Sequence, residues 1–161
     1  MKKITLTTEL TVFESVAELP EAVKPLMLAA IEARKRAYAP YSGFSVGAAL
    51  ALENGEIITG SNQENASYPS GLCAERVAIY YAGAKFPGEA ITTIAISATS
   101  DKNRVNVPIP PCGACRQAIA EYEVKQQSPI TLYFMGETGN IIKANALKDL
   151  LPLIFEKSLL K

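Results

Sequence analysis

Histidine and tryptophan are both missing from this sequence of 161 residues, and cysteine occurs only three times. An odd number of cysteines cannot pair completely within one chain, which argues against a domain held together by disulfides. Metal binding or redox chemistry remains as a use for the cysteines. Because there is no histidine, a metal site would have to take its soft ligands from cysteine alone.

An excess of charge of either sign is also missing, because 16 Lys and Arg residues balance 16 Asp and Glu residues. A neutral chain has no long-range field to attract nucleic acid or an anionic membrane, and without tryptophan it gives no sign of a base-stacking groove. The densest basic run, residues 34–36, falls where a helix is expected to end. Cations there complement the helix dipole, and a phosphate-binding patch is the alternative. We therefore expect a small-molecule partner, and neither nucleic acid nor membrane.

Long hydrophobic runs are absent as well, so no segment is predicted to span a membrane. Lys2 and Lys3 could open a signal peptide, but residues 4–11 alternate between apolar and polar side chains and form no continuous apolar core. These features predict a cytoplasmic protein.

The chain has the length of one ordinary domain, and its apolar residues predict alternating strands and helices. Alternation from Ile4 to Val12 predicts a strand near the N-terminus. Further strands are expected at 45–52, 56–60, 91–98 and 129–136, and helices at 21–38, 73–84, 112–122 and 146–157. Strands separated by single helices predict an α/β fold with a sheet sandwiched by helices and with the final strand pairs parallel.

The three cysteines each stand at the start of a predicted helix, Cys73 in one and the Cys112/Cys115 pair in another. Helix N-termini stabilise the thiolate, which is the form that binds metal. A structural zinc site needs four protein ligands, so three cysteines would leave one position open for a water with a pKa near neutrality. The alternatives are a buried, inert Cys73, a C-x-x-C redox pair, and a carboxylate as the fourth ligand.

Glu75 lies two residues after Cys73, in the first turn of the same predicted helix. A carboxylate beside a metal-bound water could accept a proton from it and pass the proton on. The alternative is an ordinary glutamate that favours the helix N-terminus.

The segments CAER at 73–76 and PCGACRQ at 111–117 resemble the cytidine deaminase family, in particular its small homotetrameric type with a three-cysteine zinc site. Matching blocks occur in the family's order at 38–50, 62–76 and 150–155. The resemblance implies a three-layer α/β/α fold with a central mixed five-stranded sheet, to which an extra N-terminal strand could be added. It divides the chain into an N-terminal extension, 1–20, and a deaminase domain, 21–161.

The resemblance also implies the activity: zinc-dependent hydrolytic deamination of cytidine and 2′-deoxycytidine to the uridines, with release of ammonia, as in pyrimidine salvage. Cys73, Cys112 and Cys115 would hold one Zn²⁺ per subunit, and Glu75 would carry the proton. Arg76 would hydrogen-bond the cysteine sulfurs and offset the charge of three thiolates; its alternative is a surface arginine.

Substrate contacts follow from the same resemblance. Asn62 and Glu64 would hold the ribose, and Phe44 would stack on the pyrimidine unless it is only a core aromatic. Tyr68 and Phe155 match positions at subunit interfaces, so active sites would be shared within a homotetramer. The alternative for Phe155 is a core residue on a helix face.

Residues 1–20, a long loop at 100–110 and a short tail after Phe155 depart from the family pattern. Three rival functions remain at this point: a deaminase for another aminopyrimidine, as in the blasticidin-type enzymes; a non-catalytic binding module stabilised by zinc; and an enzyme that edits RNA or single-stranded DNA.

Overall fold

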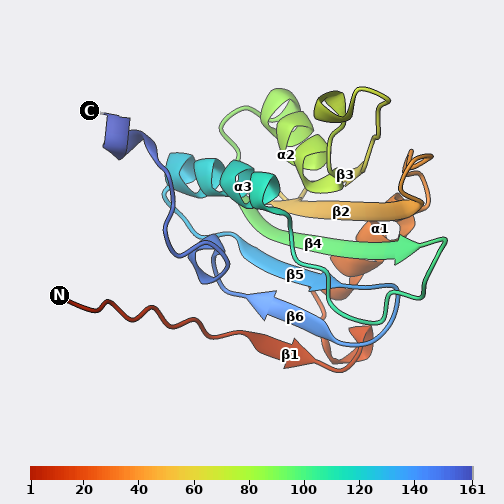
Figure 1. Cartoon of the computed structure of the whole chain (residues 1–161), viewed down its shortest axis with the longest axis horizontal. Coiled ribbons are helices and arrows are strands. Elements are labelled where there is room, and N and C mark those ends of the chain that lie inside the picture. Colours follow the sequence, from red (N-terminus) through yellow and green to blue (C-terminus); the bar gives the residue numbers. More distant parts are fainter. Residues whose placement is uncertain (161) are drawn as a thin grey trace.

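A six-stranded mixed sheet with the order β1-β6-β5-β4-β2-β3 forms the centre of the computed structural model, which describes residues 1–160. Figure 1 shows this sheet with helices on both faces. The strands are β1 (Thr11–Phe13), β2 (Phe44–Leu52), β3 (Ile57–Ser61), β4 (Ile91–Ser100), β5 (Thr131–Met135) and β6 (Ile141–Ala144). The helices are α1 (Lys24–Arg34), α2 (Ala74–Lys85) and α3 (Gly113–Gln126). The three-layer α/β/α architecture is therefore confirmed, with the extra N-terminal strand as its sixth.

The sheet is antiparallel except where β4 pairs with β5. Parallel neighbours need a crossover connection, and α3 supplies it. The expectation that the final strand pairs are parallel holds for β4 and β5 only. The strand β6, which the sequence patterns did not predict, returns antiparallel to β5 after the turn at Gly139 and Asn140.

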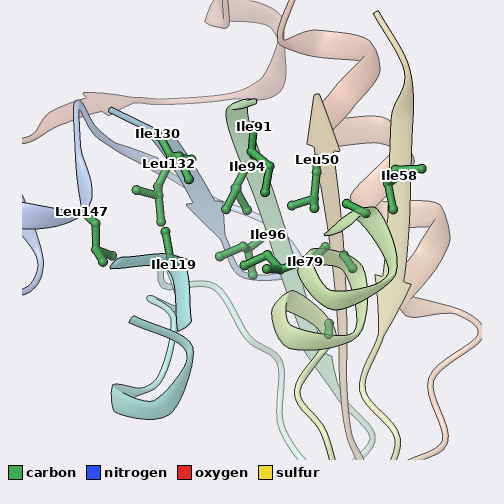
Figure 2. Close-up of a cluster of buried hydrophobic side chains, with 14 of the residues drawn as sticks. Leu50, Ile58, Ile79, Ile91, Ile94, Ile96, Ile119, Ile130, Leu132 and Leu147 are labelled. Atoms are coloured by element: carbon green, nitrogen blue, oxygen red, sulfur yellow. The ribbon is translucent and has the colours of Figure 1, made fainter. Parts of the chain in front are cut away.

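Two apolar clusters fill the spaces between the layers. One lies between the sheet and α2 with α3, and Figure 2 shows side chains such as Leu50, Ile79 and Ile119 meeting there. The other lies under α1, where Leu26 and Met27 pack against the opposite face of the sheet. Val16 and Leu19 of the N-terminal extension join this second cluster.

Glycine allows both flanking helices to approach the sheet closely. A Cβ on Gly47 would lie 2.1 Å from the Ala30 carbonyl oxygen of α1, and a Cβ on Gly60 would lie 2.6 Å from the Ala74 carbonyl oxygen of α2. Gly60 is the more important for function, because Ala74 directly follows a predicted metal ligand, Cys73. The close packing of α2 on β3 thereby fixes where that ligand stands.

At the ends of the chain, the bounds predicted for the N-terminal strand are wrong, and so is the predicted C-terminal helix. The expected strand from Ile4 to Val12 is reduced to Thr11–Phe13, because only these residues find a partner in β6. The expected helix at 146–157 is replaced by two 3₁₀ turns, Leu147–Asp149 and Lys157–Leu160. Pro152 explains the second error, since proline lacks an N–H and disfavours helical backbone at the residue before it.

None of the helices in residues 1–160 has both the length and the apolar character needed to cross a membrane.

Candidate metal centre

Three cysteine sulfurs converge where the N-termini of α2 and α3 meet. Cys73 is the N-cap residue of α2, Cys112 is the N-cap residue of α3, and Cys115 lies in the first turn of α3. The Sγ atom of Cys112 lies 3.8 Å from that of Cys73 and 3.5 Å from that of Cys115. All three sulfurs lie within 4.8 Å of one another.

This spacing fits a metal ion and excludes a disulfide. Bonded sulfurs are about 2.05 Å apart, whereas sulfurs at about 2.3 Å from a tetrahedral zinc lie about 3.8 Å from each other. Cys115 is fully buried, Cys73 is half-buried and Cys112 is exposed. The cluster therefore reaches from the core to the surface, as a site with access for a ligand must.

The sulfurs differ in how strongly they hold a proton. The neighbouring Cys115 thiol, and after it the guanidinium of Arg76, hold the pKa of Cys73 down to about 5. The hydrogen bond to Cys73 and burial raise the pKa of Cys115. One thiolate is thus stabilised by donors around it, and a divalent cation would stabilise all three.

Glu75 is buried beside the cluster, with 4% of its surface exposed, in the first turn of α2. Burial raises the pKa of its carboxyl to about 6, and the nearby charge of Cys73 contributes in the same direction. A carboxyl with a pKa close to neutrality can both accept and return a proton under physiological conditions.

Arg76 faces the same sulfurs from the next position of α2. Its Nη2 donates a hydrogen bond to the Sγ of Cys73 at 3.6 Å. The Nε atom of Arg76 is buried and has no hydrogen-bond partner among residues 1–160. The guanidinium thus brings its charge to the thiolates while part of its donor capacity stays unused.

A cavity of about 470 Å³ opens next to Cys73 and Arg76. Its lining is a mixture of aromatic, amide, carboxylate and small residues from the chain between β1 and α2. Besides Cys73 and Arg76, these are Tyr41, Ser42, Asn62, Gln63, Glu64, Asn65, Tyr68, Gly71 and Leu72. Three of the predicted substrate-contacting residues, Asn62, Glu64 and Tyr68, are among them, whereas Phe44 and Phe155 are not.

Asn62 links the cavity wall to the sheet. Its Oδ1 accepts a hydrogen bond from the Val46 N–H at 2.7 Å, and its Nδ2 donates to the Phe44 carbonyl at 2.9 Å. Phe44 itself is half-buried at the start of β2. The amide of Asn62 therefore holds the N-terminal end of β2 in place, in addition to any contact with a ligand.

Glu64 is held by the turn at Tyr41 and Ser42, just before β2. One carboxylate oxygen accepts hydrogen bonds from the backbone N–H groups of Tyr41 at 2.9 Å and Ser42 at 3.2 Å. The Ser42 side chain, followed by these backbone groups, lowers the pKa of Glu64, and Lys102 adds to the effect. The carboxylate therefore stays ionised on the wall of the cavity.

Tyr41 is the residue that sequence reasoning missed. Its ring meets that of Tyr68 edge to face, with centroids 6.0 Å apart, on the wall of the cavity. Phe155 lies elsewhere, with 59% of its surface exposed, and its carbonyl accepts a hydrogen bond from Gln117 at 2.8 Å. The interpretation of Phe155 as a core residue on a helix face is therefore wrong.

Comparisons with known proteins agree with this geometry. The family model for the cytidine and deoxycytidylate deaminase zinc-binding region matches residues 20–129, which include all three cysteines. The chain is 41% identical to a cytidine deaminase of Halalkalibacterium halodurans, over 81% of this chain and 91% of the relative. It is 38% identical to one of Sporosarcina psychrophila, over 84% of this chain and 92% of the relative.

Solved structures give the same result. The crystal structure of cytidine deaminase from Burkholderia pseudomallei matches with a TM-score of 0.72 and 38% sequence identity, over 85% of this chain and all of the other. The zinc-binding region of the family and the three convergent sulfurs together make zinc the cofactor of this centre. The chain belongs to the cytidine deaminase family.

Proposed function

We propose that this protein is a zinc-dependent hydrolase that converts cytidine and 2′-deoxycytidine to uridine and 2′-deoxyuridine with release of ammonia. The observation that carries the proposal is the buried carboxyl of Glu75 beside three convergent sulfurs, next to a cavity of about 470 Å³. Family membership and relatives that bear the name cytidine deaminase support the same reaction.

Cys73, Cys112 and Cys115 would hold the ion, and a bound zinc supplies a water of lowered pKa together with a positive charge. Glu75 then manages the protons. Its carboxylate accepts one from the water, whose oxygen forms a bond to the amine-bearing carbon of the ring. The same carboxyl donates this proton to the ring nitrogen. It then carries the proton of the added hydroxyl to the amine, so that the carbon–nitrogen bond breaks, ammonia leaves and the carbonyl of the product forms.

Arg76 would balance the charge of the ligands. Three thiolates around a divalent ion leave a net negative charge, which weakens the ion's ability to acidify water. The hydrogen bond from Arg76 to the Cys73 sulfur draws electron density away from that ligand. The arginine therefore acts through Cys73 and does not need to touch the substrate.

The sugar would bind at the opposite end of the cavity. The carboxylate of Glu64 can accept a hydrogen bond from a ribose hydroxyl, and Asn62 and Tyr68 line the same cavity. An ionised carboxylate at this end disfavours a phosphate group, so the free nucleoside is the better substrate than its 5′-phosphate.

Phe155 and Phe44 would contact the substrate only when subunits assemble. Phe155 is exposed on the C-terminal segment and does not line the cavity of its own chain, which suits a residue that enters a neighbour's site. Tyr68, with 75% of its surface exposed at the mouth, would meet the neighbouring subunit. We therefore propose a homotetramer with shared active sites, in which Phe44 contacts the pyrimidine once the site is complete.

The cellular role would be pyrimidine salvage in the cytoplasm. The three cysteines are free thiols in the structure, and a reducing compartment would keep them available as ligands.

The test is direct. Purified zinc-loaded protein is mixed with cytidine, and ammonia release is measured together with the loss of cytidine ultraviolet absorbance. Steady turnover of both cytidine and deoxycytidine is expected. Zinc-loaded, oligomeric protein that turns over neither nucleoside would contradict the proposal and direct the search to other aminopyrimidines.

A further inference from the structure

The first ten residues, here called the N-terminal arm, project from the edge of the sheet. Figure 1 shows them leaving β1 as a long, nearly straight trace, and all ten are exposed. The Thr8 hydroxyl donates a hydrogen bond to the Asp149 carbonyl at 2.9 Å, which ties the arm to the region around the first C-terminal 3₁₀ turn. The arm continues β1, the strand at one edge of the sheet, beyond the last residue that pairs with β6.

The arm has the sequence of a strand that lacks its partner. Its even-numbered positions are apolar apart from Lys2 and Thr8, and its odd-numbered positions from 3 to 9 are polar. The exposed apolar side chains are Ile4 at 87%, Leu6 at 55% and Leu10 at 38%, followed by Val12 of β1 at 56%. Exposed edge strands of this kind are templates for pairing with another chain.

The direction of the apolar side chains can be read from β1. Val12 is opposite Ile142 of β6, which packs against the α2 and α3 side of the core. Phe13 points to the other face, where it meets Tyr133. Because side chains alternate along a strand, the apolar side chains of an extended arm lie on the same face as Val12. The C-terminal segment packs on that face through Leu150, Leu151 and Ile154.

The charges of the arm favour a second copy of the same arm as its partner. In an antiparallel pair centred on Leu6, Lys3 of each copy stands opposite Glu9 of the other. The twofold symmetry makes this ion pair twice. The same register places Thr5 opposite Thr7, a favourable cross-strand pair, and leaves no like charges opposite each other. Every pair in this register joins residues of the same parity, so the apolar faces of the two arms coincide.

We propose that two copies of this chain associate by antiparallel pairing of their N-terminal arms, with Leu6 of one arm opposite Leu6 of the other. The pair forms a two-stranded ribbon with one polar and one apolar face. A ribbon of two strands needs cover on its apolar face to be stable. The exposed leucines of the C-terminal segment can provide it; they are Leu153 at 78%, Leu159 at 64% and Leu160 at 72%. This contact uses residues other than Phe155 and Tyr68, the two residues proposed at the active-site interfaces.

Cross-linking tests the register. In the zinc-loaded full-length protein, Leu6→Cys is expected to form disulfide-linked dimers in a glutathione redox buffer, since each introduced thiol faces its own symmetry mate. Thr5→Cys and Thr7→Cys are the matched controls: each alone cross-links weakly, and an equal mixture of the two cross-links well. The unsubstituted protein shows whether its own cysteines contribute. Equal cross-linking of all three single variants, or none with Leu6→Cys, would overturn the proposal.

Charge reversal tests the same contact without a covalent bond. Lys3→Glu and Glu9→Lys each place like charges opposite one another twice. Each is therefore expected to raise the dissociation constant of the arm-to-arm contact roughly tenfold. The double variant Lys3→Glu with Glu9→Lys restores the pairing. Sedimentation velocity measures the association, and circular dichroism melting confirms that each variant is folded. Single variants that associate like the parent, or a double variant as weak as either single one, would show that the arm binds something other than its copy.

Discussion

Glu75 owes its proposed role to where α2 begins. Its position two residues after a ligand at the N-cap brings the carboxyl to the metal side of the helix, and burial under the sheet keeps water from lowering its pKa. A glutamate on the exposed side of the same turn would have neither property.

Replacing Glu75 by Gln is expected to reduce turnover of cytidine by at least roughly 10²–10⁴-fold, because the amide keeps the shape and cannot transfer a proton. Zinc content, measured by atomic emission, is expected to stay at one ion per chain. Glu121→Gln, on the exposed face of α3, is the matched control and should keep full activity. Retained turnover in Glu75→Gln would favour a zinc-stabilised binding module.

Arg76→Gln is expected to shift the acidic limb of the rate profile to higher pH. Without the guanidinium, the ligand sulfurs keep more negative charge, so deprotonation near the metal needs a higher pH. The measurement is kcat as a function of pH in parent and variant, with zinc content determined for both. An unchanged profile with full zinc would show that Arg76 only packs against Cys73.

At this scale the site is partly predictable from sequence. The cysteines and Glu75 could be found because few residue types hold zinc or move protons, and their spacing on two helix starts is distinctive. Tyr41 could not be found, because its place in the cavity depends on the turn at 41–43 folding back onto Glu64. That contact joins residues far apart in the chain and leaves no local pattern.

At the level of secondary-structure elements, the position of Cys73 depends on the close packing of α2 against β3. Gly60→Ala is expected to force the two apart, because the added Cβ would lie 2.6 Å from the Ala74 carbonyl oxygen. Overpacking of this kind costs about 1–3 kcal/mol of the free energy of unfolding. Zinc affinity should fall as well, since Cys73 moves with the helix. Urea unfolding and competition with a chelator measure the two effects.

The matched control is Gly113→Ala in the first turn of α3, where a new Cβ would meet nothing within 4 Å. It lies next to Cys112, yet its zinc affinity and stability should equal or exceed those of the parent. Equal losses of stability and zinc affinity in the two variants would contradict the prediction. They would show that an added methyl group near the cysteines has the same effect wherever it is placed.

Elements were predicted well where a helical apolar pattern is uninterrupted, as in α2, which was expected at 73–84 and spans Ala74–Lys85. They were predicted poorly where tertiary contacts decide. The pattern from Ile4 to Val12 is that of a strand, but β6 pairs only with Thr11–Phe13. The apolar residues after 146 pack on the core from 3₁₀ turns and loop, so their helical spacing was misleading.

At the level of the whole molecule, the proposal of shared active sites predicts complementation between variants. Phe155→Ala and Glu75→Gln are each expected to be nearly inactive. Subunits mixed after dissociation should regain activity, because one kind supplies Phe155 and the other supplies Glu75. A mixture of Glu75→Gln with the double variant Glu75→Gln and Phe155→Ala is the control and should stay inactive. Mixed assemblies without recovered activity would place Phe155 outside the neighbour's site.

The three sulfurs join parts of the chain that are otherwise far apart in sequence. Cys73 and Cys112 are separated by 39 positions, while Cys115 belongs to the same helix start as Cys112. An unfolded chain that keeps zinc on all three therefore carries a closed loop that spans β4, and it has fewer conformations than an open chain. Refolding of a chain that keeps its zinc would begin with one long-range contact already made. The metal would then favour folding of the chain as well as supply the chemistry of the site.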